Sequence, residues 1–334
     1  MKKRLHRRAS QRHQRAFTLV EVLVAMTLAL LVLGVTVTVF AGTSRSRSDL
    51  ERSNRLAENA QFALDIVTEE LRHAGFIADL NPAGAAYQIP DACATDSTAQ
   101  GYGSAPFQIP VGIRGFTPAE ATPACVTRRR ANTAMFTVRR LAADTTAAAS
   151  AIGANFLQVS KCNLDAPRVW RYTTDRTELT LRNIDCVTVA DIRRVLVRTY
   201  FVAECNDCSR DTIPTLKRLD LEGTTIVETS LVEGVENLQI EYGFDVDNDG
   251  NADRFLPALS GVAGAADNDW SNVVAARVFV LGRSIDIEPG HVEASRTYDF
   301  GQAGTLTGTT DAYKRTMLAM LIRMPNVAGP RERP

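Results

Sequence analysis

One carboxylate stands alone inside a long apolar segment near the start of this 334-residue chain. Residues 17–40 carry no formal charge except Glu21, whereas residues 1–16 carry seven Lys and Arg side chains and no acid. A charge at the centre of a membrane span costs about 2.5–3.5 kcal/mol on insertion scales, so Glu21 is a functional candidate. The chemistry it offers is ion pairing, because opposite charges attract more strongly in a low dielectric than in water.

A second group of oxygen-bearing side chains occupies alternate positions of one short segment. Its members are Asp245, Asp247, Asp249, Asn251 and Asp253. Such spacing lets carboxylates converge on one hard cation, and Gly250 at the sixth place allows the sharp turn of a calcium loop. Leu256 takes the twelfth place, where a Glu would complete an EF-hand loop, so the segment resembles the shorter calcium loops of extracellular modules. There are two alternatives for this segment: a Ca²⁺ site or a solvated Asp-Gly turn. Ca²⁺ is the one cofactor that the sequence suggests.

All six cysteines lie beyond residue 90: Cys93, Cys125, Cys162, Cys186, Cys205 and Cys208. An even number of cysteines in an exported domain favours disulfides, but the sequence does not fix how they pair. Sequential pairing is the simplest hypothesis. Cys205 and Cys208 have the spacing of a redox motif, yet residues 209–214 have the composition of a loop and not of the helix that lowers a thiol pKa. We therefore expect a structural disulfide there.

The sequence offers little support for catalysis or for nucleic-acid binding. Only two histidines, His73 and His291, follow the basic leader, and there is no HExxH, GxSxG or GxxxxGK[ST] motif. Without residues 1–16 the chain has 31 Lys and Arg against 38 Asp and Glu, so its body is acidic. We predict a protein that is not an enzyme and does not bind nucleic acid.

The element that must position Glu21 is a long helix. Residues 17–40 would span about 36 Å as a helix, enough to cross a bilayer core of about 30 Å. A polar patch follows, and apolar residues then recur at steps of three and four: Leu56, Ala60, Ala63, Leu64, Val67 and Leu71. Gly75 is a helix stop signal. We expect a transmembrane half over 17–40 and an amphipathic half over 41–75, with Glu70 among the charged residues outside the apolar stripe.

The remaining residues, 76–334, predict an exported β-rich domain. Residues 77–132 are rich in Pro, Gly, Ala, Ser and Thr and indicate an extended loop region. Strand-like runs then follow at 134–140, 155–160, 168–173, 178–182, 194–202, 215–221, 224–231, 238–242, 272–281 and 314–324. The predicted fold class is α+β, with the long N-terminal helix packed on an antiparallel sheet and with disulfide-tied loops.

Three interpretations of residues 1–40 remain: a secretory signal cut near Ala41, an uncleaved membrane anchor, and a segment cut between Ala16 and Phe17. The segment from Arg15 to Glu21 resembles a type IV prepilin leader, in which a small residue precedes an aromatic residue and a Glu is fifth in the mature chain. Gly usually occupies the position held here by Ala16. The resemblance implies that a prepilin peptidase cuts before Phe17 and methylates its amine, and that Glu21 pairs with the amine of a neighbouring subunit.

Three further segments, 58–76, 231–255 and 314–323, are similar to PilW-type minor pilins. This resemblance implies a pilin-like fold and a role in assembling a type IV pilus, in its initiation or tip complex. The implied partners are major and minor pilins, the prepilin peptidase, the inner-membrane assembly platform and a tip adhesin. The implied location is a single pass of the inner membrane, with residues 1–16 cytoplasmic and the body periplasmic, and later the pilus. The alternatives are a type II secretion pseudopilin and a membrane-anchored exported enzyme or binding domain.

Overall fold

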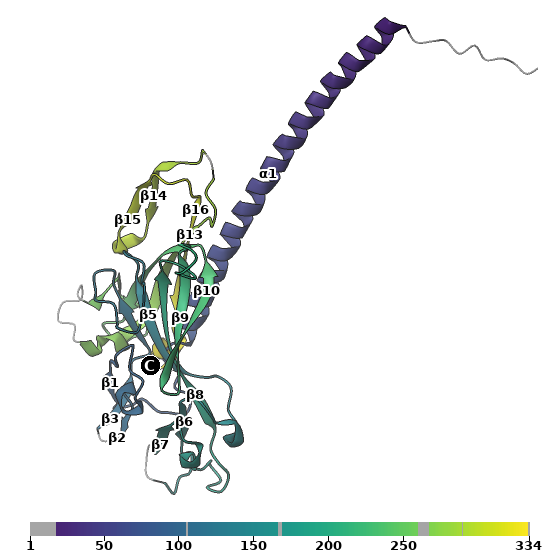
Figure 1. The fold of residues 1–334 in the computed structure, drawn as a ribbon. Coiled ribbons are helices and arrows are strands. Elements are labelled where there is room, and N and C mark those ends of the chain that lie inside the picture. Colours follow the sequence, from purple (N-terminus) through teal and green to yellow (C-terminus); the bar gives the residue numbers. More distant parts are fainter. Residues whose placement is uncertain (1–17, 105, 166–168, 260–266, 289, 333–334) are drawn as a thin grey trace, which may run out of the picture. The chain divides into compact units, whose positions relative to one another are not determined.

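The computed structural model describes residues 18–104, 106–165, 169–259, 267–288 and 290–332 (Figure 1). The chain forms two compact units, residues 1–52 and 53–334. Helix α1 (Leu19–His73) runs through the first unit and into the second.

The first unit contains the N-terminal part of α1, which remains helical through the β-branched run at residues 35–39. Such residues disfavour helix in water, since their side chains lose freedom against the preceding turn. The two threonines of this run bond back to the helix: Thr36 Oγ1 donates to the carbonyl of Val32 at 2.7 Å, and Thr38 Oγ1 donates to that of Val35 at 2.8 Å. No hydroxyl of the run is therefore left without an acceptor, as a hydrocarbon environment requires.

In the second unit, the C-terminal part of α1 packs by its predicted apolar stripe. The stripe residues are all buried: Leu56, Ala60, Ala63, Leu64, Val67 and Leu71. The helix ends at His73, and Gly75 follows with a φ of +73°, which a glycine adopts without strain. Asn326 Nδ2 donates to the carbonyls of Arg72 at 3.2 Å and Ala74 at 3.4 Å, which satisfies acceptors that the helix end leaves free.

Two antiparallel sheets share a core with this part of α1. The larger sheet has the strand order β10-β9-β8-β5-β4, with β6 and β7 joined to it through β8. The second has the order β12-β11-β13-β16, and β14 pairs with β15 in a separate hairpin. A three-stranded sheet, β1-β3-β2, combines a parallel β1–β3 pair with an antiparallel β2–β3 pair.

The strand bounds are β1 Ala86–Gln88, β2 Gly103–Ser104, β3 Phe107–Pro110, β4 Ile113–Phe116, β5 Met135–Leu141, β6 Phe156–Val159, β7 Trp170–Thr173, β8 Ile192–Ala203, β9 Thr215–Glu222, β10 Thr225–Glu233, β11 Val235–Phe244, β12 Arg254–Leu256, β13 Val273–Arg283, β14 Glu293–Asp299, β15 Thr305–Thr309 and β16 Arg315–Arg323. Short 3₁₀ helices are η1 Ser97–Gln100, η2 Ala148–Ser150, η3 Arg176–Glu178, η5 Asp267–Asn272 and η6 Gly301–Ala303, and α2 covers Pro325–Ala328.

Helix α1 and both sheets contribute to one apolar cluster, and two aromatic pairs lie in it. Phe136 of β5 stacks on Tyr200 of β8 with 5.1 Å between ring centroids, and Tyr242 of β11 meets Trp270 edge-on at 4.9 Å. Gly115 lies against the Tyr242 ring, and a Cβ there would come within 2.3 Å of it. A side chain at 115 would therefore displace the ring from the core.

The α+β class with its long helix, antiparallel sheets and disulfides is confirmed, but two local predictions are wrong. Residues 77–132 contain β1 to β4, which are too short to show alternation in sequence. Residues 178–182 form no strand: η3, capped by Asp175, ends at Glu178, and Arg182 makes only an isolated bridge with Val189. Strands β12, β14 and β15 were not predicted.

Candidate assembly surface

Glu21 lies in the first turn of α1 and the residue before the helix caps that turn. Thr18 Oγ1 accepts the backbone N–H of Glu21 at 3.3 Å, and the Thr18 carbonyl accepts that of Val22 at 3.2 Å. A Thr followed three residues later by a Glu is the capping-box pattern, a sequence signal for the start of this helix. The helix N-terminus also favours an anion in this turn. Ala16 and Phe17, the predicted processing residues, lie outside the described residues.

The surface that follows Glu21 is apolar and exposed. Every side chain from Leu19 to Phe40 is exposed within the first unit, at 78% for Leu19 and 76% for Phe40. In the described part of the chain, α1 is the one helix long and apolar enough to cross a membrane. Within those same residues, the Glu21 carboxylate has no ion-pair partner. This half of the helix is thus an apolar surface with a single unmatched charge.

Glu70, a charged residue outside the apolar stripe of the amphipathic half, is buried. Its carboxylate accepts from Arg140 Nε at 2.7 Å, from Arg198 Nη1 at 2.8 Å and from the Tyr200 hydroxyl at 3.0 Å. Arg198 also donates to Asp220 at 3.0 Å. The network joins α1 to β5 and β8, and it fixes which face of the helix contacts the larger sheet.

The protonation of Glu70 is coupled to these bonds. Burial acts to raise the pKa of Glu70, but the hydrogen bonds and charges of Arg140 and Arg198 overcome it and hold the pKa below its usual value. Glu70 therefore stays ionised in the folded body at neutral pH. An ionised, fully paired carboxylate is a strong positional constraint, because removing any partner leaves a buried charge.

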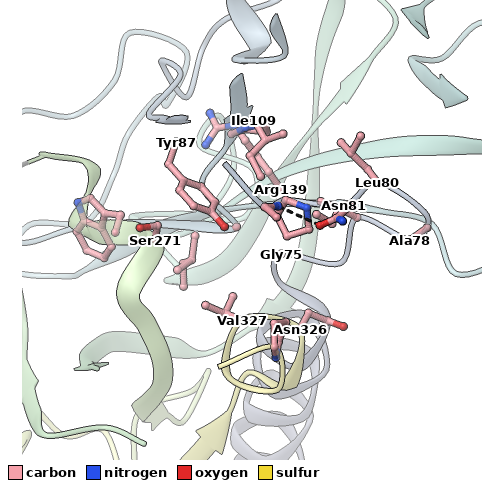
Figure 2. A pocket seen from close by; sticks show the side chains of 18 of the residues that line it. Gly75, Ala78, Leu80, Asn81, Tyr87, Ile109, Arg139, Ser271, Asn326 and Val327 are labelled. Carbon is pink, nitrogen blue, oxygen red and sulfur yellow. Dashed lines mark hydrogen bonds between the residues drawn. The ribbon is translucent and has the colours of Figure 1, made fainter. Parts of the chain in front are cut away.

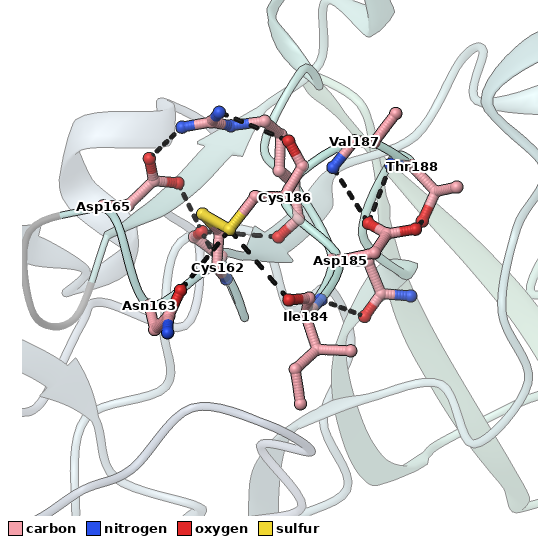
Figure 3. Close-up of a disulfide and its surroundings, with 11 residues drawn as sticks. Cys162, Asn163, Asp165, Ile184, Asp185, Cys186, Val187 and Thr188 are labelled. Carbon is pink, nitrogen blue, oxygen red and sulfur yellow. Dashed lines mark hydrogen bonds and ion pairs between the residues drawn. A yellow bond between two sulfur atoms is a disulfide. The ribbon is translucent and has the colours of Figure 1, made fainter.

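The structure joins the six cysteines in sequential order: Cys93–Cys125, Cys162–Cys186 and Cys205–Cys208. Figure 3 shows the second bond beside the turn at 183–188. In that turn the Asp185 carboxylate accepts the N–H groups of Val187 and Thr188, each at 2.9 Å. The three bonds fasten loop segments outside the strands, and each constrains the unfolded chain.

Three of the predicted calcium ligands come together in the structure. One carboxylate oxygen from each of Asp245, Asp247 and Asp253 lies within 4.8 Å of the others, whereas Asp249 bonds to Asn251 outside this group. Asp245 is buried and already accepts the N–H of Gly250 at 3.0 Å and the guanidinium of Arg331 at 3.0 Å. An arginine therefore neutralises the innermost carboxylate of the loop. Calcium binding stays a prediction.

Two family models match the chain. Residues 11–37 match the prokaryotic N-terminal methylation motif, which covers the predicted processing residues, Glu21 and much of the apolar helix. Residues 199–326 match the type IV pilus-assembly protein W family, from within β8 to the start of α2. No curated protein and no solved structure matches the chain.

The match to the methylation motif, together with the long apolar helix and the antiparallel sheets, supports a prepilin-like protein. The second match confirms the predicted resemblance to PilW-type minor pilins. Both matches support a pilin of type IV pilus assembly, which is a structural class of protein. The long apolar helix and the prepilin-type motif indicate a membrane-anchored protein.

Proposed function

We propose that the chain is a minor pilin of the initiation or tip complex of a type IV pilus. It is cut between Ala16 and Phe17 and enters the filament through the exposed face of α1. The observation that carries this proposal is the apolar helix from Leu19 to Phe40, with Glu21 as its one charge and no ion-pair partner for it among the described residues. Such a surface is stable only where lipid or other apolar helices cover it.

The proposed chemistry of assembly is a charge pair between subunits. Cleavage gives Phe17 a cationic amine, and Glu21 of one subunit accepts it from a neighbour as the two helices pack. In lipid the unpaired Glu21 is costly, and in the packed filament the pair is favourable because both charges are neutralised in a low dielectric. The charge of Glu21 thus favours helix packing in the filament over burial in lipid. The apolar face of α1 favours either of these surroundings over water.

The proposed orientation follows from the charges and the cysteines. The seven positive charges of residues 1–16 keep that end in the cytoplasm, since positively charged flanks stay inside. The body then lies in the periplasm, where an oxidising compartment maintains its three disulfides. The partners in this account are the prepilin peptidase, the inner-membrane assembly platform, the major and minor pilins and a tip adhesin.

The test is Glu21→Ala, with Glu51→Ala as a matched control on the same helix. Glu51 is exposed and pairs with Arg47 one turn away, so its loss leaves the apolar face intact. We expect Glu21→Ala to insert and to be cleaved, but to enter sheared filaments more than about a hundredfold less, because an unpaired buried amine costs about 3–5 kcal/mol. Equal incorporation of both variants would reject the pairing role.

The methylation motif is also compatible with a type II secretion pseudopilin, which shares the leader. A deletion strain separates the two, since loss of twitching identifies the pilus and loss of exoprotein secretion identifies the pseudopilus. A membrane-anchored exported enzyme or binding domain would instead retain Met1 or be cut near Ala41.

A further inference from the structure

Strand β16 forms one edge of the four-stranded sheet and, among the described residues, pairs with β13 alone (Figure 1). The pairing runs without a register shift from Arg315 opposite Arg283 to Arg323 opposite Ala275. Every residue from Met317 to Ile322 is apolar. Edge strands present unpaired backbone groups, so natural proteins shield them with charges, prolines or bulges. The interior of β16 has none of these three features.

The edge strand of the larger sheet, β10, is shielded in this way. A register shift between Ser230 and Val232 interrupts its pairing with β9. Glu228 places a charge in the middle of the strand and pairs with Lys217 at 2.7 Å. The two edges therefore differ, and β16 lacks the protection that β10 has.

The backbone groups of β16 point alternately toward β13 and toward the free edge. Just beyond one end, the N–H of Met324 donates to the carbonyl of Val274 at 2.8 Å. Just beyond the other end, the carbonyl of Lys314 accepts the N–H of Ser284 at 2.8 Å. Antiparallel bonding recurs at every second residue, so the even-numbered residues of β16 bond to β13 and the odd-numbered residues point outward.

The first outward residue, Arg315, has partners from β14. The Glu293 carboxylate accepts its backbone N–H at 3.3 Å, and the Tyr298 hydroxyl lies 3.4 Å from its carbonyl oxygen. In the described part of the chain, the next outward backbone groups have no such partner; they belong to Met317, Ala319 and Leu321. Each of these residues offers one N–H donor and one C=O acceptor.

The side chains around these groups are apolar and open to solvent on one face. Leu321 is 61% exposed, and Ala319 is also exposed. On the other face of the strand, Leu318 and Met320 are half-buried against the apolar cluster that α1 and the two sheets share. Apolar side chains of an added strand would therefore extend this cluster.

The spacing of the outward groups selects the occupant. Donors and acceptors that repeat at every second residue lie about 6.8 Å apart along a strand. An extended backbone matches this repeat, and the addition of a strand to a free sheet edge is a common mode of peptide recognition. Lipid chains offer no hydrogen-bonding groups that could match it.

A second copy of this chain suits the edge less well than a different polypeptide does. Two copies of β16 can pair symmetrically only in the antiparallel direction, because parallel pairs are offset. Such a pair points the two bodies, and the segments of α1 packed in them, in opposite directions. Chains anchored in one membrane by α1 share one direction, so they cannot form this pair.

We propose that β16 receives an antiparallel β-strand from another polypeptide, which extends the four-stranded sheet. Backbone hydrogen bonds at Met317, Ala319 and Leu321 hold the incoming strand. Apolar residues at alternate positions of that strand pack beside Leu318 and Met320. This contact requires neither cleavage before residue 17 nor the charge of Glu21, so it holds or fails independently of them.

The test uses the full chain in phosphatidylcholine nanodiscs and a fluorescein-labelled peptide, Lys-Thr-Val-Thr-Val-Thr-Val-Lys. With the valines beside Leu318 and Met320, the threonine N–H groups point at β16 and the valine N–H groups point away. We expect N-methylation of the three threonines to weaken binding at least about tenfold in fluorescence polarisation, because it removes the hydrogen bonds to the edge. N-methylation of the three valines should leave binding unchanged. Equal affinity of the two methylated peptides, or no binding of the unmodified peptide, overturns the proposal.

Ala319→Pro removes one outward N–H and leaves the bonds of the even-numbered residues to β13 in place. It should weaken binding of the unmodified peptide at least about fivefold. Ala319→Val is the matched control, because it keeps the N–H and should bind the peptide as the wild type does. Unchanged binding by Ala319→Pro overturns the proposal, and the comparison of methylated peptides holds even if this variant fails to fold.

Analytical ultracentrifugation of the same nanodiscs tests the identity of the occupant. We expect the wild-type chain to remain monomeric. A dimer that Ala319→Pro dissociates would make a second copy the occupant and would overturn the assignment to another polypeptide.

Discussion

Replacing Glu70 by alanine should weaken the attachment of α1 to the larger sheet. The carboxylate is 6% exposed and receives hydrogen bonds from Arg140, Arg198 and Tyr200, at 2.7, 2.8 and 3.0 Å. In the variant, Arg198 keeps its bond to Asp220, whereas Arg140 keeps no acidic partner in the described residues. Glu70→Ala therefore breaks a buried pair and also leaves a guanidinium uncompensated.

The expected loss is about 3 kcal/mol in the free energy of unfolding. Breaking a buried ion pair costs about 3–5 kcal/mol, and we take the lower end because the side chains of Arg140 and Arg198 are 13% and 17% exposed. Glu70→Gln keeps the shape and part of the hydrogen bonding, so it should cost about 1–2 kcal/mol. Glu69→Ala is the control, because the neighbouring carboxylate is 69% exposed and should contribute less than about 0.5 kcal/mol.

The assay is equilibrium unfolding in urea, followed by tryptophan fluorescence. Both tryptophans, Trp170 and Trp270, lie in the second unit, so the signal reports on the body that contains the network. The expected order of stability is wild type and Glu69→Ala, then Glu70→Gln, then Glu70→Ala. If Glu70→Ala unfolds at the same urea concentration as Glu69→Ala, the network does not fasten the helix to the sheet and the reasoning fails.

Three further predictions concern acid, reduction and calcium. The pKa of Glu70 is below its usual value in the folded state, so the stability that ionised Glu70 contributes is present above about pH 4.3 and is lost as the pH falls through the folded pKa. Glu70→Gln should therefore flatten the acid limb of a plot of unfolding free energy against pH. An unchanged acid limb in this variant would contradict the prediction. Replacing the Cys162–Cys186 bond by alanines should lower the free energy of unfolding by about 3 kcal/mol, and replacing the Cys205–Cys208 bond should lower it by about 2 kcal/mol, because the first bond closes the longer loop. The reverse order in calorimetry would contradict an entropic origin of this stabilisation. If the acidic loop binds calcium, titration calorimetry should show that Asp247→Ala abolishes the heat of calcium binding and that Asp249→Ala retains it, because the Asp249 carboxylate lies outside the converging group of Asp245, Asp247 and Asp253. Loss of the heat in both variants or in neither would show that these three carboxylates are not the ligand set.

The amphipathic half of α1 could be predicted because its packing is a local property of the sequence. Steps of three and four place Val67 and Leu71 on one face, and both are buried. Glu70 could not be predicted as buried, since its partners Arg140 and Arg198 lie 70 and 128 positions further along the chain. From the sequence alone, a charged residue beside an apolar stripe is predicted to be exposed to solvent. Its burial depends on partners in strands far along the chain.

The acidic loop shows the same limit. Alternating carboxylates with Gly250 at the turn were visible, and three of them converge. The bond from Arg331 to Asp245 spans 86 positions, so no local pattern indicates that an arginine takes part. A cavity of about 840 Å³ beside the end of α1 is assembled from segments between residues 75 and 331 (Figure 2), which are likewise far apart in the sequence.

The most direct test of the pilin account is mass spectrometry of the N-terminus of the mature protein, isolated from the membrane and from sheared filaments. The account predicts that the chain begins at an N-methylated Phe17, with residues 1–16 removed. An intact Met1, or a chain beginning near residue 41, would contradict it.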